Sequence, residues 1–162
     1  MEQEVIKAIE LRHEGKQKES NELLLKVVKE FPKDAYANYH CAWSFDLLGK
    51  EAEAIPYYEK AIDLGLAGKD LEGAILGLGS SCRALGQYEK AKAVFLKGIT
   101  LFPNNRALKV FYSMALYNTG EHQGAMEILL TCLIETTSDE NILHYKRAIS
   151  FYSDKLDQTW ND

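Results

Sequence analysis

The sequence predicts an all-α protein built from antiparallel helix pairs, and two observations lead to this prediction. Apolar residues recur at helical spacing along the chain, as Ala54, Tyr58 and Ala61 do. A glycine ends these runs at regular distances, because glycine adopts positive φ without strain at a helix terminus. The corner glycines are separated by 34, 37 and 34 residues, and they are Gly15, Gly49, Gly86 and Gly120. Each corner joins two helices, so four helix pairs are expected.

The same types of residue return at fixed distances from each corner. A small residue stands seven positions before every corner: Ala8, Ala42, Gly79 and Ser113. A second small residue stands five positions after it: Ser20, Ala54, Ala91 and Ala125. A large residue stands nine positions after it: Leu24, Tyr58, Phe95 and Leu129. Small residues let paired helices approach closely, and the large residues fill the space beside them.

Element boundaries follow from caps and breaks along the chain. Helices are expected over residues 2–14, 17–31, 34–48, 51–64, 69–85, 88–102, 105–119, 121–136 and 138–156. Pro32 and Pro103 follow the second helices of units one and three, where a proline stops a helix. Ser138–Asp139 provides short polar side chains that cap a helix start. Three extra residues separate the second and third corners, so a longer loop is expected near Gly65–Asp70.

The length of 162 residues and the apolar fraction of 46% are sufficient for one domain with a continuous core. A single domain over residues 1–162 is therefore expected, with repeats at about 1–34, 35–68, 72–105 and 106–137. A capping helix at 138–156 and a short tail at 157–162 complete it. One apolar stripe predicts that this last helix covers its neighbour, and it consists of Ile142, Tyr145, Ile149, Tyr152 and Leu156.

The third unit resembles the tetratricopeptide repeat, whose pattern is W-x2-L-G-x2-Y, then A-x3-F, then P. The matching residues are Leu78, Gly79, Cys82, Ala91, Phe95 and Pro103. No unit has the leading tryptophan, and Leu66 and Thr137 replace the closing proline of units two and four. The resemblance covers about residues 1–137 and extends to small single-domain bacterial proteins of similar length. It implies a right-handed superhelical solenoid, a role in protein–protein interaction, and a homodimer.

Composition excludes several classes of function. With 19 basic and 24 acidic residues the net charge is −5, which argues against binding nucleic acid or an anionic membrane. The acidic N-terminal stretch lacks the features of a signal peptide, and no window is apolar enough to span a membrane. Three cysteines cannot all pair, so a reduced, cytoplasmic setting is expected.

No combination of residues predicts catalysis. The four histidines fall in different units without metal-binding spacing, and they are His13, His40, His122 and His144. The three cysteines occupy packing positions, where a buried thiol behaves as a small apolar group: Cys41, Cys82 and Cys132. The sequence therefore predicts a protein that is not an enzyme and that binds no cofactor or metal.

The first helices of the units should instead line a concave, apolar and aromatic groove, as the family geometry implies. The predicted partner-binding residues are Tyr36, Tyr39, His40, Trp43, Asp46, Leu76, Arg83, Val110, Met114 and Tyr117. Arg12, Asp46 and Arg83 form a charged line along one side of this face. The family's clamp for a C-terminal carboxylate needs lysine, asparagine and arginine. Other residues stand at those positions here: Val5, Ile9, His40, Gly73 and Gly77.

Three hypotheses about function remain open at this point. The first is an interaction module whose groove binds a peptide or protein segment. The second is a homodimeric scaffold that buries the apolar surface in its own interface. The third, an enzyme or a component of an enzyme complex, has no converging residues in its favour. Aromatic residues at helical spacing also occur in cores, so the exposure of Trp43 and Tyr39 decides whether this groove exists.

Overall fold

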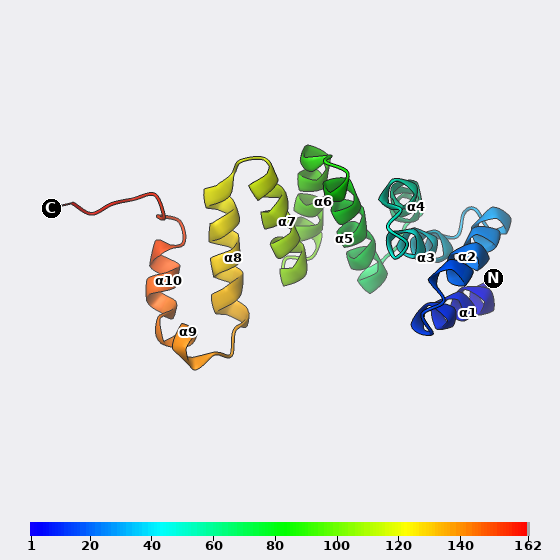
Figure 1. The fold of residues 1–162 in the computed structure, drawn as a ribbon, viewed down its shortest axis with the longest axis horizontal. Coiled ribbons are helices and arrows are strands. Elements are labelled where there is room, and N and C mark those ends of the chain that lie inside the picture. The colour runs from blue at the N-terminus through cyan, green and yellow to red at the C-terminus, as the bar shows by residue number, and fades with distance from the viewer. Residues whose placement is uncertain (162) are drawn as a thin grey trace. The chain divides into compact units, whose positions relative to one another are not determined.

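The computed structural model describes residues 1–161, which form ten α-helices and no strand, so the all-α prediction is confirmed (Figure 1). The last residue of the predicted tail 157–162 lies outside the described residues. The helices are α1 (Glu2–His13), α2 (Gln17–Glu30), α3 (Ala35–Asp46), α4 (Glu51–Asp63), α5 (Gly68–Ala84), α6 (Tyr88–Leu101), α7 (Arg106–Asn118), α8 (His122–Thr136), α9 (Glu140–His144) and α10 (Lys146–Tyr152). The first eight begin and end within two residues of the predicted limits.

The chain divides into two compact units whose boundary lies inside α6. The first unit is Met1–Val94, and the second begins at Phe95. In the first unit, α1 packs on α2 and on α3, and α3 packs on α4 and α5. In the second unit, α7 lies antiparallel to α8, and α10 packs on the other side of α8 (Figure 1). Each unit therefore repeats the same helix pair.

Each predicted corner is built in the same way. The four corner glycines all have positive φ, between 66° and 82°. The residue after the glycine donates its N–H to the carbonyl five residues back, which is the bond of a Schellman helix end. The four bonds measure 2.9–3.1 Å and join Lys16 to Leu11, Lys50 to Phe45, Gln87 to Cys82 and Glu121 to Leu116. The corner thus satisfies a carbonyl that the end of the first helix would otherwise leave without a partner.

The small-residue positions lie at the helix contacts, as the sequence predicts. All eight of these residues are buried, and Ala8, Ala42, Ala54 and Ala91 are 0% exposed. In the first pair, the Ser20 hydroxyl donates to the Ala8 carbonyl of the facing helix at 2.7 Å. A bond of this length between a side chain and the neighbouring backbone requires that no larger residue stand between them.

The structure differs from the predicted capping helix over 138–156. This segment forms two short helices, α9 and α10, instead of one. Asp139 caps the start of α9 by accepting hydrogen bonds from the N–H groups of Asn141 and Ile142. The helix ends at Tyr145, where ψ is 12° and the N–H bonds to the Ile142 carbonyl three residues back. The break leaves Tyr145 61% and Tyr152 47% exposed, so α10 covers α8 only partly.

We expect Ala54→Leu to lower the free energy of unfolding by about 1–3 kcal/mol, because extra methyl groups in a close helix contact force the pair apart. Ala52→Leu is the matched control, because Ala52 lies on the same helix but is exposed. Urea denaturation of both variants measures the difference. Equal stability of the two would show that Ala54 is not at a tight contact.

Candidate functional site

An aromatic cluster lies on α3 around His40. The His40 ring meets Tyr36 edge-on with centroids 4.3 Å apart, and it stacks on Trp43 at 5.9 Å with an interplanar angle of 19°. Tyr39 lies 5.0 Å from the same ring. His40 itself is only 3% exposed. Four aromatic residues separated by three or four positions on one helix therefore form a continuous contact surface.

Arg12 reaches this cluster from α1. Its guanidinium carbon lies 3.8 Å from the centroid of a Trp43 ring, which is a cation–π geometry. Its Nη1 lies 3.5 Å from Nδ1 of His40. Because a guanidinium only donates hydrogen bonds, Nδ1 is the acceptor and the proton of a neutral His40 resides on Nε2. That Nε2 is buried and has no hydrogen-bond partner in the part of the chain that the structure describes.

The surroundings of His40 disfavour its charged form. Burial first, and the positive charge of Arg12 second, lower the pKa of His40 from its ordinary 6.5 to about 4. The imidazole is therefore neutral at physiological pH, and its uncharged ring packs beneath Trp43.

The cluster separates the predicted groove residues into an outer and an inner layer. Trp43 is 37% exposed and Tyr36 is half-buried, so these two rings reach the surface. Tyr39 is only 6% exposed and lies beneath them together with His40, which differs from the predicted groove surface. The physical reason lies on α5, where a Cβ on Gly73 would clash with the Tyr39 hydroxyl. Glycine at this position lets the ring of Tyr39 insert between α3 and α5.

Asp46 is held in a hydrogen-bonded junction of three helices and does not stand in a free charged line. Its carboxylate accepts bonds from the Tyr58 hydroxyl at 2.6 Å and from the Ser81 hydroxyl at 2.8 Å. Burial raises the pKa of Asp46, while both hydrogen bonds act in the opposite direction. Gly77 makes room for this junction, because a Cβ there would clash with the Tyr58 ring. Asp46 therefore ties α3 to α4 and α5.

A small cavity adjoins the outer layer beside Tyr36. Its volume is about 350 Å³, and it is lined by Met1, Glu2, Val5, Ile6, Asp34 and Tyr36. Most of these side chains are apolar, and the two carboxylates are Glu2 and Asp34. Tyr36 thus belongs both to the cavity and to the aromatic cluster.

The remaining predicted groove residues lie elsewhere. Leu76 and Arg83, on α5 of the first unit, are half-buried. On α7 of the second unit, Val110 is half-buried, Met114 is 39% exposed and Tyr117 is 64% exposed. The Tyr117 ring lies 4.8 Å from that of His122. These α7 residues form a separate apolar face, which belongs to the second unit.

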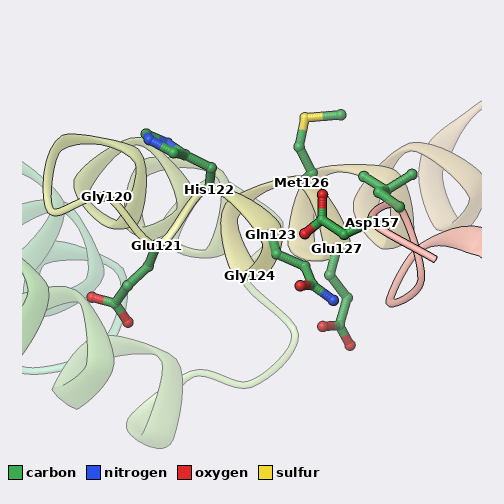
Figure 2. A pocket seen from close by; sticks show the side chains of 9 residues that line it. Gly120, Glu121, His122, Gln123, Gly124, Met126, Glu127 and Asp157 are labelled. Carbon is green, nitrogen blue, oxygen red and sulfur yellow. The ribbon is translucent and has the colours of Figure 1, made fainter.

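A larger cavity of about 710 Å³ lies in the second unit, between the start of α8 and the segment after α10 (Figure 2). The Gln123 side-chain amide donates to the Asp154 carbonyl at 2.8 Å and holds the two segments together. Figure 2 shows His122 and Met126 pointing to one side, and Gln123 and Glu127 pointing to the other. Side chains that diverge in this way do not meet at a common reacting centre.

Other chemical functions find no support among the described residues. All three cysteines are free and buried, and burial raises the pKa of Cys41 to about 12, so its thiol is not a nucleophile. No group of three or more histidine, cysteine or acidic side chains within residues 1–161 is placed to hold a metal ion. No described helix has the length and apolar character needed to cross a membrane.

Two features of the site lie beyond what sequence reasoning found. The contact of Arg12 with Trp43 joins two repeats, and the sequence pointed to it only by placing both residues on the groove-facing side of consecutive first helices. The close fits of Tyr39 on Gly73 and of Tyr58 on Gly77 have a weak sequence signal, namely two glycines inside a helix that would otherwise favour alanine.

The lowered pKa of His40 predicts a loss of stability in acid. Between pH 6.5 and about 4 the unfolded chain binds a proton at this residue and the folded chain does not. Relative to His40→Gln, the native protein should therefore lose up to about 3 kcal/mol of unfolding free energy as the pH falls through this window. Urea denaturation at pH 7 and pH 4.5 measures the change, with His122→Gln on an exposed histidine as the control. If the unfolding free energies of the native protein and of His40→Gln change equally with pH, the lowered pKa of His40 is contradicted.

Comparison with known proteins agrees with this architecture. A family model described as tetratrico peptide repeat matches residues 35–156. A comparison with curated proteins gives no match. Among solved structures, MamA from Desulfovibrio magneticus RS-1 is similar with a TM-score of 0.75 and 13% identity, over 94% of this chain and 85% of that one. YrrB, described as a TPR protein with an unusual peptide-binding site, is similar with a TM-score of 0.71 and 16% identity, over 94% of this chain and 77% of that one.

A third similar structure is PilF of Pseudomonas aeruginosa, with a TM-score of 0.70 and 14% identity, over 99% of this chain and 77% of that one. At these identities the solved structures show the fold alone. The family model covers three quarters of the sequence and includes the second to fourth helix pairs. The chain therefore belongs to the tetratricopeptide repeat family.

Proposed function

We propose that this protein is a non-enzymatic interaction module that binds a peptide or protein segment on the first-helix face of its repeats. The observation that carries the proposal is the partly exposed ring of Trp43. The Arg12 guanidinium contacts this ring, and the buried ring of His40 stacks on it. Tryptophan, tyrosine and arginine are the residues in which interface energy concentrates. We further propose that the chain acts as a single domain in a reduced, cytoplasmic setting. The three free cysteines support this setting.

The cluster is suited to binding because it is ordered before a partner arrives. Binding normally costs conformational entropy when exposed side chains become fixed. Here the Trp43 ring is already held by His40 on one side and by Tyr39, 5.9 Å away, on another. The unusual peptide-binding site of YrrB is a property of that protein, and it supports only the general idea that this fold accepts a peptide.

Trp43→Ala should weaken association with a peptide selected from a displayed library by about 2 kcal/mol or more, the scale of an interface hot spot. Its effect on folding should be smaller than the roughly 3–5 kcal/mol of a fully buried tryptophan, because Trp43 is 37% exposed. Trp160→Ala is the matched control, since that ring is 57% exposed and lies in the second unit. Calorimetric titration and urea denaturation separate the two effects. Lost stability with unchanged affinity would assign Trp43 to the core.

A homodimeric scaffold is the second candidate, and the incomplete cap favours it. On α8, Met126, Leu129 and Leu133 are 37–42% exposed and lie on one helical stripe. In the last helices and the segment after them, further apolar residues are 40–61% exposed: Leu143, Tyr145, Phe151, Tyr152, Leu156 and Trp160. Large apolar side chains exposed in such number are a common feature of interaction sites.

If this surface pairs with a second copy, Leu133→Glu should convert a dimer to a monomer at micromolar concentration, because it buries a charge in an apolar interface. Leu64→Glu is the control, because Leu64 is similarly exposed on the first unit. Light scattering gives the mass of each protein. A monomer mass for the native chain at every concentration would remove this candidate.

A further inference from the structure

Arg12 is a half-buried charge that has no anionic partner within residues 1–161. Its only polar contact is the 3.5 Å approach to Nδ1 of the neutral His40, and no carboxylate among the described residues pairs with it. Burial lowers the pKa of Arg12. A guanidinium has five N–H donors and stays charged, so donors remain available above the ring of Trp43. Proteins normally pair such a charge with a carboxylate.

The cavity and the guanidinium lie at two levels of the same helix face. Val5 of the cavity and Arg12 are seven residues apart on α1, which places them on one side, about 10 Å apart along the axis. Tyr36 and Trp43 are also seven residues apart on α3. Tyr36 lines the cavity and Trp43 lies under the guanidinium. The two helices therefore present an apolar hollow and, two turns further on, a cation on an aromatic ring.

We propose that this face binds a peptide in the polyproline II conformation, whose apolar side chain enters the cavity beside Tyr36 and whose carboxylate side chain pairs with Arg12. The inference rests on the proposed function and names the chemistry of the partner. In a polyproline II helix, side chains three residues apart lie on the same face and about 9 Å apart, which matches the axial distance between the two levels. The acidic side chain should therefore follow the apolar one at the third position.

Charge determines both the class of partner and its direction. The carboxylates of Glu2 and Asp34 stand at the cavity, and the Met1 ammonium there is already paired with the Glu4 carboxylate at 3.2 Å. An acidic side chain is therefore disfavoured at that end and favoured at Arg12. A nucleic acid or another polyanion would also meet these two carboxylates and a chain of net charge −5. One carboxylate beside an apolar anchor is the ligand that fits.

The test uses Trp43 as the reporter in the full chain carrying Trp160→Phe, because the sequence has only 2 tryptophans. The probes are peptides acetyl-X-Ala-Ala-Asp-Ala-amide with X as leucine, isoleucine, methionine or phenylalanine. Two comparison sets carry asparagine in place of aspartate, or place the aspartate directly after X. We expect the first set to bind about ten-fold more tightly than the asparagine set, which corresponds to one charge-assisted hydrogen-bonded pair. We also expect a loss of this preference when aspartate adjoins X.

Arg12→Gln should abolish the preference for aspartate, while Arg106→Gln, on an arginine paired with Glu135 in the second unit, should leave it unchanged. Circular dichroism melts establish that each variant is folded. Equal affinity for the aspartate and asparagine sets would overturn this inference and leave the proposed function standing. A preference that survives Arg12→Gln would also overturn it. Absence of binding by every set would contradict both the inference and the proposed peptide-binding face.

Discussion

The close approach of paired helices at small residues is the constraint on which the other features depend. Ala42 and Ala54 are fully buried where α3 meets α4, and Gly49 turns the chain between them with φ of 66°. Because no large side chain separates the two helices, the Schellman bond from Lys50 to the Phe45 carbonyl can form at the corner. The same arrangement recurs at the other three corners, which is why one packing rule accounts for most of the core.

A second close approach, between repeats, positions the candidate site. Gly73 and Gly77 on α5 leave space for Tyr39 and Tyr58, and the hydroxyl of Tyr58 then reaches Asp46. Filling the interior in this way leaves the outward side of α3 to Trp43 and Tyr36. The exposed ring of Trp43 is thus supported from below by buried aromatic residues. An anchor that is already ordered loses less entropy on binding than a mobile one.

This arrangement disfavours the charged forms of the two basic side chains beside it, because it buries them. His40 must remain neutral, since burial and the charge of Arg12 lower its pKa to about 4. Arg12 keeps its charge in a half-buried position without a carboxylate partner in the described chain. Apolar residues at these two positions would stabilise a core at least as well, so stability alone does not explain His40 and Arg12. These two residues support the proposal that a partner binds on the face of α1 and α3.

The fold class, the four corners and the limits of the first eight helices could be predicted from the sequence, because these depend on local spacing and on the backbone freedom of glycine. The sequence also predicted Tyr36, Tyr39 and Trp43 on the groove-facing side of one helix, but it left their exposure open. The packing of the helices buries Tyr39 and His40 beneath Trp43, and it places Arg12 over the Trp43 ring. It also brings the Asp46 carboxylate to the hydroxyls of Tyr58 and Ser81. These outcomes depend on residues of other helices, whose distance and orientation no helical period encodes. The break at Tyr145 has a similar origin, because an apolar stripe shows which side of a segment packs but not where its helix must bend to follow α8.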